Sequence, residues 1–374
     1  MSDIIVIGAR GIPNVEGGAE KNAEKLFPLI ARAGYSVEFV GLQEYIKSPS
    51  YEGVKLTRVP TTSFFKTDKV VYNLVAFLMA AVKRPRIVHL QCLNAALFLL
   101  LYKLVGLKVV VRYGSSDHEF TKWRGIGRYA LKLCEYQVRY ADHVITVSQR
   151  FRRQLKERYG IEKITVIPNG LDPVQVSPQS EAFLEDLGLR GKRFVLSVGR
   201  VTADKDFETL VEAVKQLRDP DVQLIVAGGG EAGYAEKFFD HKDPRVRFIG
   251  RVERDLLAAL YANCAVYVNS SRHEGLSNAI LEALSYSCPI VVSDIAANTE
   301  LALPRHNYFA TGNAKALAGQ LEKALRRPEA FVAPADGFAQ WSDVFDATMK
   351  VYQSVAPGRF GKIVRSDELT RATT

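Results

Sequence analysis

Two charged side chains five positions apart stand in a loop that is suited to binding phosphate. Arg200 and Lys205 follow the apolar run Phe194–Gly199, which reads as a buried strand. Arginine presents a fork of donors that matches phosphate oxygens, and lysine presents a compact positive charge. The pair therefore predicts a site for two adjacent phosphates, although a solvated loop with ordinary salt bridges would use the same residue types.

Two carboxylates form a second pair, eight positions apart. Glu274 follows the apolar run Ala265–Asn269, and Glu282 lies on a helix expected to begin near Ser277. Ionised carboxylates accept hydrogen bonds from hydroxyl groups, and a helix start favours negative charge. Glu282 stands within the apolar run Ala279–Leu284, so we expect it on a partly buried face with a partner. A plain surface glutamate is the alternative.

A glycine-rich loop follows the first strand. It runs from Gly8 to Glu20 and contains Gly17 and Gly18 immediately before a helix expected from Ala19. Glycines let backbone N–H groups approach an anion, and a helix N-terminus attracts one. The loop has neither the Gly-Lys-Ser/Thr ending of a P-loop nor the G-x-G-x-x-G spacing of a dinucleotide site. A tight turn without a ligand remains the alternative.

Apolar runs that alternate with amphipathic stretches must position these residues. The runs are rich in β-branched residues and almost continuously apolar, which is typical of parallel strands buried on both faces. Strands that alternate with helices predict an α/β fold of doubly wound parallel sheets. Expected helices include 19–33, 207–217 and a last helix at 341–355.

The pattern of strands and helices restarts in the second half of the chain. A chain of 374 residues suits two domains, and a stretch with Pro and Ser at 172–179 separates the halves. We expect a first Rossmann-like domain at 1–172, a second at 173–345, and a final helix and tail at 346–374 that returns to the first domain. Two such domains are expected to face a cleft, into which the carboxyl ends of the strands point.

Composition excludes several classes of protein. The chain is 47% apolar and 24% charged, as in an ordinary soluble enzyme. Its four cysteines have no C-x2-C spacing, which argues against a zinc site and favours buried, reduced thiols in the cytoplasm. No apolar run reaches the ~20 residues of a spanning helix.

Charge is unevenly distributed along the sequence. Residues 1–170 carry 26 Lys and Arg against 14 Asp and Glu, a net charge of +12. The remaining residues carry 24 against 27, a net charge of −3, which completes the total of +9. Basic residues interleave with apolar ones in the helical region 129–158. The first half therefore predicts an anionic partner, and we expect a membrane surface; a solvated basic face is the alternative.

Together these motifs resemble the retaining glycosyltransferases of family 4, which have the GT-B fold. The resemblance rests on Arg-x4-Lys and E-x7-E and extends over most of residues 165–300. The supporting segments are Pro168–Asp172, Ala227–Glu231, Phe248–Val252 and Pro289–Asp294. The segments Arg10–Pro13 and Gly17–Glu20 resemble a subgroup of bacterial rhamnosyl and related transferases for surface polysaccharides.

The resemblance implies a role for each candidate residue. Arg200 and Lys205 would bind the donor diphosphate, Glu282 the ribose hydroxyls, and Glu274 the transferred sugar. Other donor-binding positions would be Gly17, Gly18, Arg251, Val252, Leu276, Ser277 and Asn278. Arg251 and Val252 would hold the base through their main chain, and the helix start at Ser277 would face the diphosphate.

One part of the sequence departs from the family pattern. Many members have a histidine after the fifth strand of the first domain, where this chain has Tyr113. Asp117 and His118 follow four and five residues later, and we treat both as candidate catalytic residues. An exposed loop without a role is the alternative for this pair.

These features predict a hexosyltransferase that moves a sugar from a nucleotide-sugar donor to a glycan or polyprenyl-diphosphate-linked acceptor, with no cofactor and no metal. The sequence lacks a D-x-D pair and His or Cys clusters. We expect a cytoplasmic protein, peripheral on the inner leaflet. The donor sugar, the base, the linkage and the oligomeric state remain open.

Three other functions remain as alternatives. A sugar-nucleotide epimerase of the same fold would convert donor without acceptor, and a non-catalytic sugar-nucleotide or glycan-binding module would bind without turnover. A nucleic-acid binder would fit the isoelectric point of about 9.2, but no aromatic–basic motif or helix-turn-helix pattern supports it. We therefore expect no nucleic-acid partner.

Overall fold

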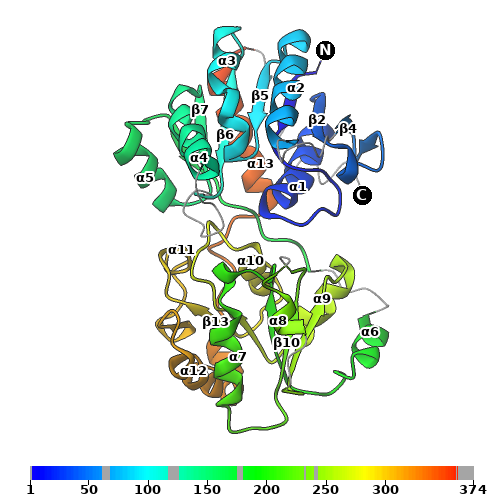
Figure 1. The fold of residues 1–374 in the computed structure, drawn as a ribbon, viewed down its shortest axis with the longest axis vertical. Coiled ribbons are helices and arrows are strands. Elements are labelled where there is room, and N and C mark those ends of the chain that lie inside the picture. The colour runs from blue at the N-terminus through cyan, green and yellow to red at the C-terminus, as the bar shows by residue number, and fades with distance from the viewer. Residues whose placement is uncertain are drawn as a thin grey trace. The chain divides into compact units, whose positions relative to one another are not determined.

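A computed structural model describes residues 2–60, 68–116, 126–174, 180–230, 233–239, 243–358 and 360. The chain divides into two compact units (Figure 1). Unit 1 comprises Met1–Gly170 and Ala339–Thr374, and unit 2 comprises Leu171–Phe338. Each unit is built on its own largely parallel sheet. Within its described residues, no helix is both long and apolar enough to cross a membrane.

The sheet of unit 1 has eight strands in the order β3-β4-β2-β1-β5-β6-β7-β8. The strands are β1 (Ile4–Ile7), β2 (Val37–Leu42), β3 (Ser50–Tyr51), β4 (Val54–Val59), β5 (Ile87–Leu90), β6 (Val109–Tyr113), β7 (His143–Thr146) and β8 (Ile164–Val166). All neighbours are parallel except β3 and β4, which form an antiparallel hairpin. The strand order reverses between β1 and β5, which pair directly with Ile4 opposite Ile87.

Helices cover both faces of this sheet. Ile4 and Val6 point into one apolar core, which contains residues of α1 (Gly18–Arg32) and α13 (Trp341–Val355). Ile5 and Ile7 point the opposite way, since side chains alternate along a strand. The opposite face is covered by α2 (Asp68–Lys83), by η3 (Leu93–Phe98) with α3 (Leu99–Leu104), and by α4 (Ile126–Gln137) (Figure 1). Helix α5 (Gln149–Tyr159) packs beside β7 and β8.

The sheet of unit 2 has six parallel strands in the order β11-β10-β9-β12-β13-β14. The strands are β9 (Phe194–Val198), β10 (Gln223–Ala227), β11 (Val246–Gly250), β12 (Val266–Asn269), β13 (Ile290–Ser293) and β14 (Tyr308–Phe309). Val195 of β9 enters a core with α7 (Phe207–Lys215) and α12 (Ala314–Arg326). Its neighbours Phe194 and Leu196 enter a core with α9 (Arg254–Asn263) and α10 (Asn278–Ser285). Burial on both faces explains why these strands are apolar throughout.

The remaining helices of unit 2 are short. They are α6 (Ser180–Asp186), α8 (Glu236–Phe239), α11 (Ala296–Thr299), η6 (Ala203–Lys205), η7 (Arg305–Asn307) and η8 (Pro328–Phe331). Helix α6 packs against α9, and α8 packs against β11.

The chain returns to unit 1 earlier than the sequence boundary of 345/346 predicts, because the change of unit falls between Phe338 and Ala339. The whole of α13 belongs to unit 1, since its apolar side chains share a core with α1; those side chains include Trp341, Phe345, Met349 and Tyr352. The first crossing falls at Gly170, close to the expected 172. A Cβ atom at Gly170 would lie 2.6 Å from the Trp341 nitrogen, so the two crossing segments touch there.

The basic region 129–158 consists of two helices with a strand between them. Helix α4 ends at Gln137, β7 intervenes at His143–Thr146, and α5 begins at Gln149. The side chain of Ser148 accepts a hydrogen bond from the Phe151 nitrogen (3.3 Å) and thereby caps α5. The basic residues of this region are therefore divided between two separate helices.

Candidate active site

The strand order of unit 2 reverses between β9 and β12. The chain starts at β9, adds β10 and β11 on one side, and then crosses to add β12, β13 and β14 on the other. In open α/β sheets, ligands bind beyond the carboxyl ends of the strands at such a reversal. Arg200 and Lys205 follow β9, and Glu274 follows β12. The structure therefore brings the two predicted charged motifs to the same point of the sheet.

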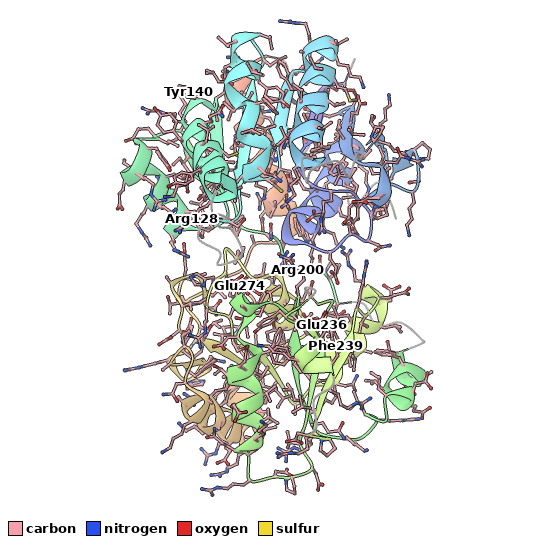
Figure 2. All side chains as sticks on the ribbon, viewed as in Figure 1. Arg128, Tyr140, Arg200, Glu236, Phe239 and Glu274 are labelled. Atoms are coloured by element: carbon pink, nitrogen blue, oxygen red, sulfur yellow. The ribbon has the colours of Figure 1, made fainter. Side chains whose placement is uncertain are left out.

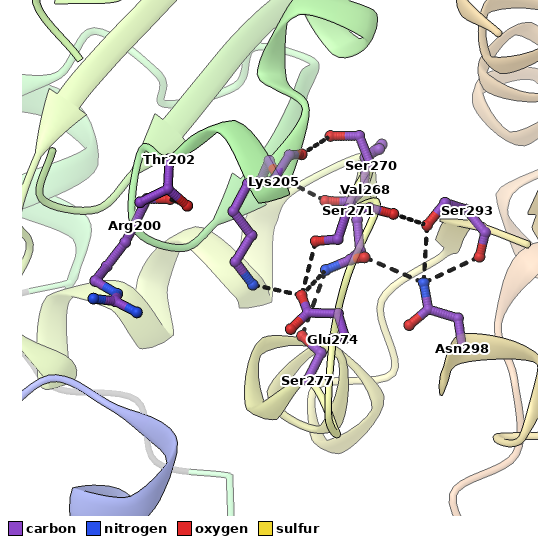
Figure 3. A network of polar contacts seen from close by, with 12 residues as sticks. Arg200, Thr202, Lys205, Val268, Ser270, Ser271, Glu274, Ser277, Ser293 and Asn298 are labelled. Atoms are coloured by element: carbon purple, nitrogen blue, oxygen red, sulfur yellow. Dashed lines mark hydrogen bonds and ion pairs between the residues drawn. The ribbon is translucent and has the colours of Figure 1, made fainter. Parts of the chain in front are cut away.

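Lys205 and Glu274 form an ion pair at this point (Figure 3). The same Glu274 Oε1 accepts hydrogen bonds from Ser271 Oγ at 2.8 Å and from Asn269 Nδ2 at 3.3 Å. The carboxylate side chain is 11% exposed and the lysine side chain 22% exposed. Both groups are thus held in place and yet reach the surface of unit 2.

The surroundings of Glu274 keep it ionised. Burial opposes the negative charge, but the positive charge of Lys205 and hydrogen bonds from Lys205, Ser271 and Asn269 outweigh it. The pKa of Glu274 therefore lies below its ordinary value. An ionised carboxylate accepts hydrogen bonds from sugar hydroxyls and stabilises positive charge that develops nearby.

The loops that carry Lys205 and Glu274 are tied together through their backbones. Ser270 Oγ donates to the carbonyl oxygen of Lys205 at 2.8 Å, and the Arg272 nitrogen donates to the Asp204 carbonyl at 2.8 Å. Arg272 also pairs with Asp206 at 2.9 Å. The ion pair is therefore one contact in an interface between two loops that follow neighbouring strands.

Asn298, on α11, extends this network, and the sequence did not indicate it. Its amide donates to Asn269 Oδ1 at 3.2 Å and to the carbonyl of Ser293 at 3.0 Å. Ser293 Oγ in turn donates to the Ser271 carbonyl at 2.6 Å. Asn269 and Ser293 carried a signal, because each is a polar residue at the end of an apolar strand. Asn298 lies on α11, and no local pattern indicates its partners.

Arg200 lies outside this network. Arg200 is exposed, and Figure 3 draws no interaction between its guanidinium group and the other residues shown. Its backbone position is fixed because Val201 forms a parallel bridge with Gly230. Gly228 is required beside it, since a Cβ atom there would lie 2.0 Å from the Gly199 carbonyl oxygen. A rigid backbone thus presents an exposed cation close to the Lys205 loop.

Glu282 lies on the second turn of α10 and is half-buried, as its apolar neighbours predicted. The hydroxyl of Tyr261, on α9, donates to Glu282 Oε2 at 2.7 Å. Tyr261 is buried, and burial together with the charge of Glu282 raises its pKa well above the ordinary value. The tyrosine therefore acts as a neutral donor that orients the carboxylate. Sequence reasoning missed this partner, because Tyr261 reads as one more apolar residue of a helix.

The other predicted donor-binding positions of unit 2 lie at nearby element ends. Leu276 packs against the apolar core, Ser277 is buried at the start of α10, and Asn278 is its first residue. Arg251 and Val252 directly follow β11; Arg251 is exposed, and Val252 packs against the same core. All of them belong to segments that follow β11 and β12.

In unit 1, the glycine-rich loop is held by Arg10 and Glu20. Arg10 Nε donates to Glu20 Oε1 at 2.9 Å, and the Arg10 backbone nitrogen donates to the same oxygen at 3.2 Å. Gly17 has φ +134°, and a Cβ atom there would lie 2.1 Å from Glu20 Oε2. Gly18 is the first residue of α1. The loop thus requires glycine at position 17 for both its backbone angle and its space.

Tyr113, at the position where many family members carry histidine, is fully buried in unit 1. Its hydroxyl contacts Ser116 Oγ at 2.7 Å and donates to the buried Glu135. Glu135 also accepts from Tyr159 at 2.7 Å and from Arg158 at 3.1 Å. Tyr113 is therefore part of a buried polar cluster that the sequence did not reveal. Asp117 and His118 lie outside the described residues.

Where the structure describes the chain, no three or more His, Cys, Asp or Glu side chains gather as a metal site would require. The predicted site residues that gather at the reversal of the unit 2 sheet are Arg200, Lys205 and Glu274, with Glu282 on α10. Such a set can bind an anion and several hydroxyl groups of one ligand.

The arrangement of strands and helices is that of known GT-B structures. The Anabaena protein HepE, solved in complex with UDP and glucose, superposes with a TM-score of 0.77 and 18% sequence identity. The match covers 95% of this chain and 100% of HepE. At this level of identity the likeness shows the fold, and the fold is GT-B.

Two family models match consecutive parts of the sequence. Residues 16–175 match the family described as Glycosyltransferase Family 4, and residues 192–327 match the one described as Glycosyl transferases group 1. The matched parts together span most of the chain, and with the fold they identify a GT-B glycosyltransferase whose first half is similar to family 4.

Two curated relatives illustrate the range of similarity. An uncharacterised glycosyltransferase of Methanocaldococcus jannaschii is 30% identical over 52% of this chain, and the alignment spans 55% of that relative's length. The amylovoran biosynthesis glycosyltransferase AmsD of Erwinia amylovora is 25% identical over 76% of this chain and 79% of its own. The first relative is thus matched over about half its length and the second over most of it.

Proposed function

We propose that this glycosyltransferase moves a hexose from a nucleoside-diphosphate sugar to a lipid-linked glycan, with retention of anomeric configuration. The observation that carries the proposal is the Lys205–Glu274 pair at the reversal of the unit 2 sheet, with Arg200 exposed on the same loop. The presence of UDP and glucose in the HepE structure supports this class of donor.

Each charged group has a role in this reaction. Arg200 and Lys205 bind the diphosphate, and Glu282, oriented by Tyr261, accepts hydrogen bonds from the ribose hydroxyls. Glu274 accepts hydrogen bonds from the transferred sugar near its anomeric carbon.

The backbone around Arg251 and Val252 holds the base. The start of α10, at Ser277 and Asn278 next to Leu276, adds N–H groups near the diphosphate. Gly17 and Gly18 of unit 1 are further candidates to bind the donor, and Asp117 and His118 are candidate catalytic residues.

The proposed chemical step is a same-face substitution. The bond between the anomeric carbon and the donor phosphate oxygen breaks, and the acceptor hydroxyl oxygen bonds to the same face of that carbon. The leaving phosphate oxygen takes the proton of the acceptor hydroxyl, so a sugar–acceptor bond and a nucleoside diphosphate result. Arg200 and Lys205 stabilise the negative charge that develops on the diphosphate. Ionised Glu274 stabilises the positive charge that develops on the sugar ring.

We further propose that the two cations replace the divalent metal that other transferases place on the diphosphate. Activity should then survive excess EDTA, with the rate measured by release of nucleoside diphosphate. Loss of activity in EDTA and its return with magnesium or manganese would overturn this part of the proposal.

The proposed acceptor is a polyprenyl-diphosphate-linked glycan of a bacterial surface polysaccharide, reached at the inner leaflet of the cytoplasmic membrane. The basic excess of residues 1–170 favours an anionic surface. The printed name of AmsD, an amylovoran biosynthesis enzyme, supports a polysaccharide pathway. The resemblance of residues 10–20 to rhamnosyl and related transferases makes rhamnose a sugar to test first.

The donor site is tested by a thermal-shift panel of UDP, GDP, dTDP, ADP and CMP. One diphosphate should raise the melting temperature of the wild type and leave that of Glu282→Ala almost unchanged. The matching nucleotide sugars are then incubated with lipid-linked acceptor, and product anomers are assigned by NMR. A product with inverted configuration would refute the proposal. So would a panel in which no nucleotide raises the melting temperature of either protein.

A further inference from the structure

Helix α2 carries two apolar stripes, and only one of them is buried. The buried stripe includes Tyr72, Ala76 and Ala80. The exposed stripe consists of Val70, Leu74, Leu78 and Val82. Residues four apart share one face of a helix, so the exposed side chains form a continuous row. Val82 is 83% exposed, although a helix of a globular protein normally turns polar residues to water.

Two neighbouring elements continue this row. Helix α3 packs against both α2 and α4. It exposes Leu100, Leu101 and Leu104. Helix α4 and the short η5 (Val138–Tyr140) that follows it expose Tyr129, Leu133, Tyr136 and Tyr140. Leu104 is 73% exposed and Tyr129 is 74% exposed. We call the exposed apolar residues of α2, α3, α4 and η5 together the apolar face.

The apolar face holds most of the exposed apolar side chains that the structure describes. Val71 completes its twelve large members, and the three others are Val174, Phe239 and Val332 of unit 2. Monomeric soluble proteins rarely expose a large contiguous apolar surface, and where one occurs it usually marks an interaction site.

The charges around the apolar face are positive. Among the described side chains of α2, α3, α4 and η5, the exposed charged residues are Lys69, Arg128, Lys132 and Arg139. The one carboxylate among those side chains, Glu135, is buried. Arg139 also lies over the ring of Tyr136, at 5.1 Å from its centroid. Figure 2 labels Arg128, near the start of α4, and Tyr140, the last residue of η5.

We propose that the apolar face docks unit 1 on an anionic lipid bilayer. The leucine and valine rows enter the boundary between headgroups and acyl chains, and the cations contact lipid phosphates. Tyrosines, with apolar rings and polar hydroxyls, suit the same depth. A second copy fits less well, because a symmetric contact would bring like charges together. The inference rests on the proposed lipid-linked acceptor, since it explains how the enzyme reaches that acceptor.

Helix α5 is the rival docking element. It exposes Arg152, Arg153 and Lys156, but its apolar residues Phe151 and Leu155 are buried. It can attract lipid phosphates but has no apolar side chains to insert. The apolar face, with both kinds of residue, therefore makes the larger contribution to bilayer binding.

The test is vesicle flotation with the full chain, using phosphatidylglycerol–phosphatidylcholine vesicles and pure phosphatidylcholine vesicles. The variant Leu78→Gln, Val82→Gln, Leu104→Gln keeps the net charge and changes only exposed residues. It should need at least tenfold more anionic lipid for half-maximal binding. The control Val174→Gln, Val332→Gln changes exposed apolar residues of unit 2 and should bind as the wild type does.

Several outcomes would overturn the proposal. Binding of the triple variant like the wild type would show that the apolar face does not insert. Failure of the wild type to bind anionic vesicles would do the same. A wild-type dimer that becomes monomeric in the triple variant, measured by light scattering, would assign the face to a second copy. Thermal shifts with nucleotides should be equal in all three proteins, so a failure of the proposed reaction is read separately from a failure of docking.

Discussion

Lys205 and Glu274 are 69 positions apart in the sequence and form an ion pair where β9 and β12 end. These two strands are neighbours only because the chain crosses the sheet after β11. The pair therefore depends on the reversal of strand order that also creates a ligand site in such sheets. Lys205 helps to keep Glu274 ionised, so the site places a cation and an anion side by side for a ligand that presents both phosphates and hydroxyls.

The first prediction concerns the charge of Glu274. Glu274→Gln keeps the shape of the side chain but removes the negative charge that opposes positive charge on the sugar. We expect kcat to fall by about 10²-fold or more, while the affinity for nucleoside diphosphate changes little. Steady-state kinetics with the identified donor, together with calorimetric binding of the diphosphate, measures both quantities. Near wild-type turnover in the folded variant would reject a catalytic role for Glu274.

The second prediction concerns pH and the partner of Glu274. Since its pKa in the folded protein is lowered, the ionised carboxylate stabilises the fold above its unfolded pKa of about 4.3. That stabilisation is lost as the pH falls through the lower, folded-state pKa. Lys205→Met leaves a buried carboxylate without its cation and should lower the free energy of unfolding at pH 7 by about 2–3 kcal/mol. The deficit should shrink toward pH 4, where protonation relieves the unpaired charge.

Urea unfolding of both proteins between pH 4 and pH 8 measures this dependence. Lys215→Met is a matched control, because Lys215 pairs with Glu212 on the exposed side of α7. Removing such a surface pair should change stability by less than about 1 kcal/mol. A deficit of Lys205→Met that stays constant with pH would mean that Glu274 does not titrate against Lys205.

The candidate site residues that could be predicted from the sequence are those that follow strands. Arg200, Lys205 and Glu274 each lie on the loop that follows an apolar run, and parallel strands end at one edge of a sheet. The period and length of those runs also gave the α/β class, and the last helix was placed at its observed bounds of Trp341–Val355. Local pattern is sufficient wherever a residue's role depends on the element next to it.

The residues that sequence could not supply act through contacts between distant segments. Tyr261 reaches Glu282 from another helix, and Asn298 reaches Asn269 from beyond the next strand. The buried Glu135 likewise has partners on β6 and α5 that no spacing reveals. The return of the chain to unit 1 was expected, but its position at Ala339 was not, because that position depends on the core that α13 shares with α1.

The third prediction concerns the orientation of Glu282. Glu282→Ala removes charged hydrogen bonds to the ribose, each worth roughly 1.5–3 kcal/mol, so affinity for the nucleoside diphosphate should fall by about tenfold or more. Tyr261→Phe keeps the carboxylate but removes the 2.7 Å hydrogen bond that orients it. Its affinity should fall by a smaller factor, about fivefold for a loss near 1 kcal/mol. Isothermal titration calorimetry gives both values.

Glu212→Ala is the control for this pair, because Glu212 lies exposed on α7 and should leave nucleotide affinity unchanged. The order of effects is the informative result. If Tyr261→Phe binds like the wild type while Glu282→Ala is weakened, then the carboxylate acts without its buried tyrosine. Equal affinity in all four proteins would remove Glu282 from the donor site.

The fourth prediction concerns the glycine-rich loop of unit 1. Gly17→Ala places a methyl group where Glu20 Oε2 now lies, and Glu20 cannot move without leaving Arg10. Gly34→Ala is a matched control, because Gly34 also has positive φ (+89°) but has open space around it. The control should lose roughly 1–2 kcal/mol from backbone strain alone. Gly17→Ala should lose at least about 1 kcal/mol more, because its backbone (φ 134°, ψ 150°) is more strained for alanine and because the methyl group also disturbs the Arg10–Glu20 pair. Equal losses of unfolding free energy in urea would show that Glu20 gives way freely and that the pair does not hold the loop.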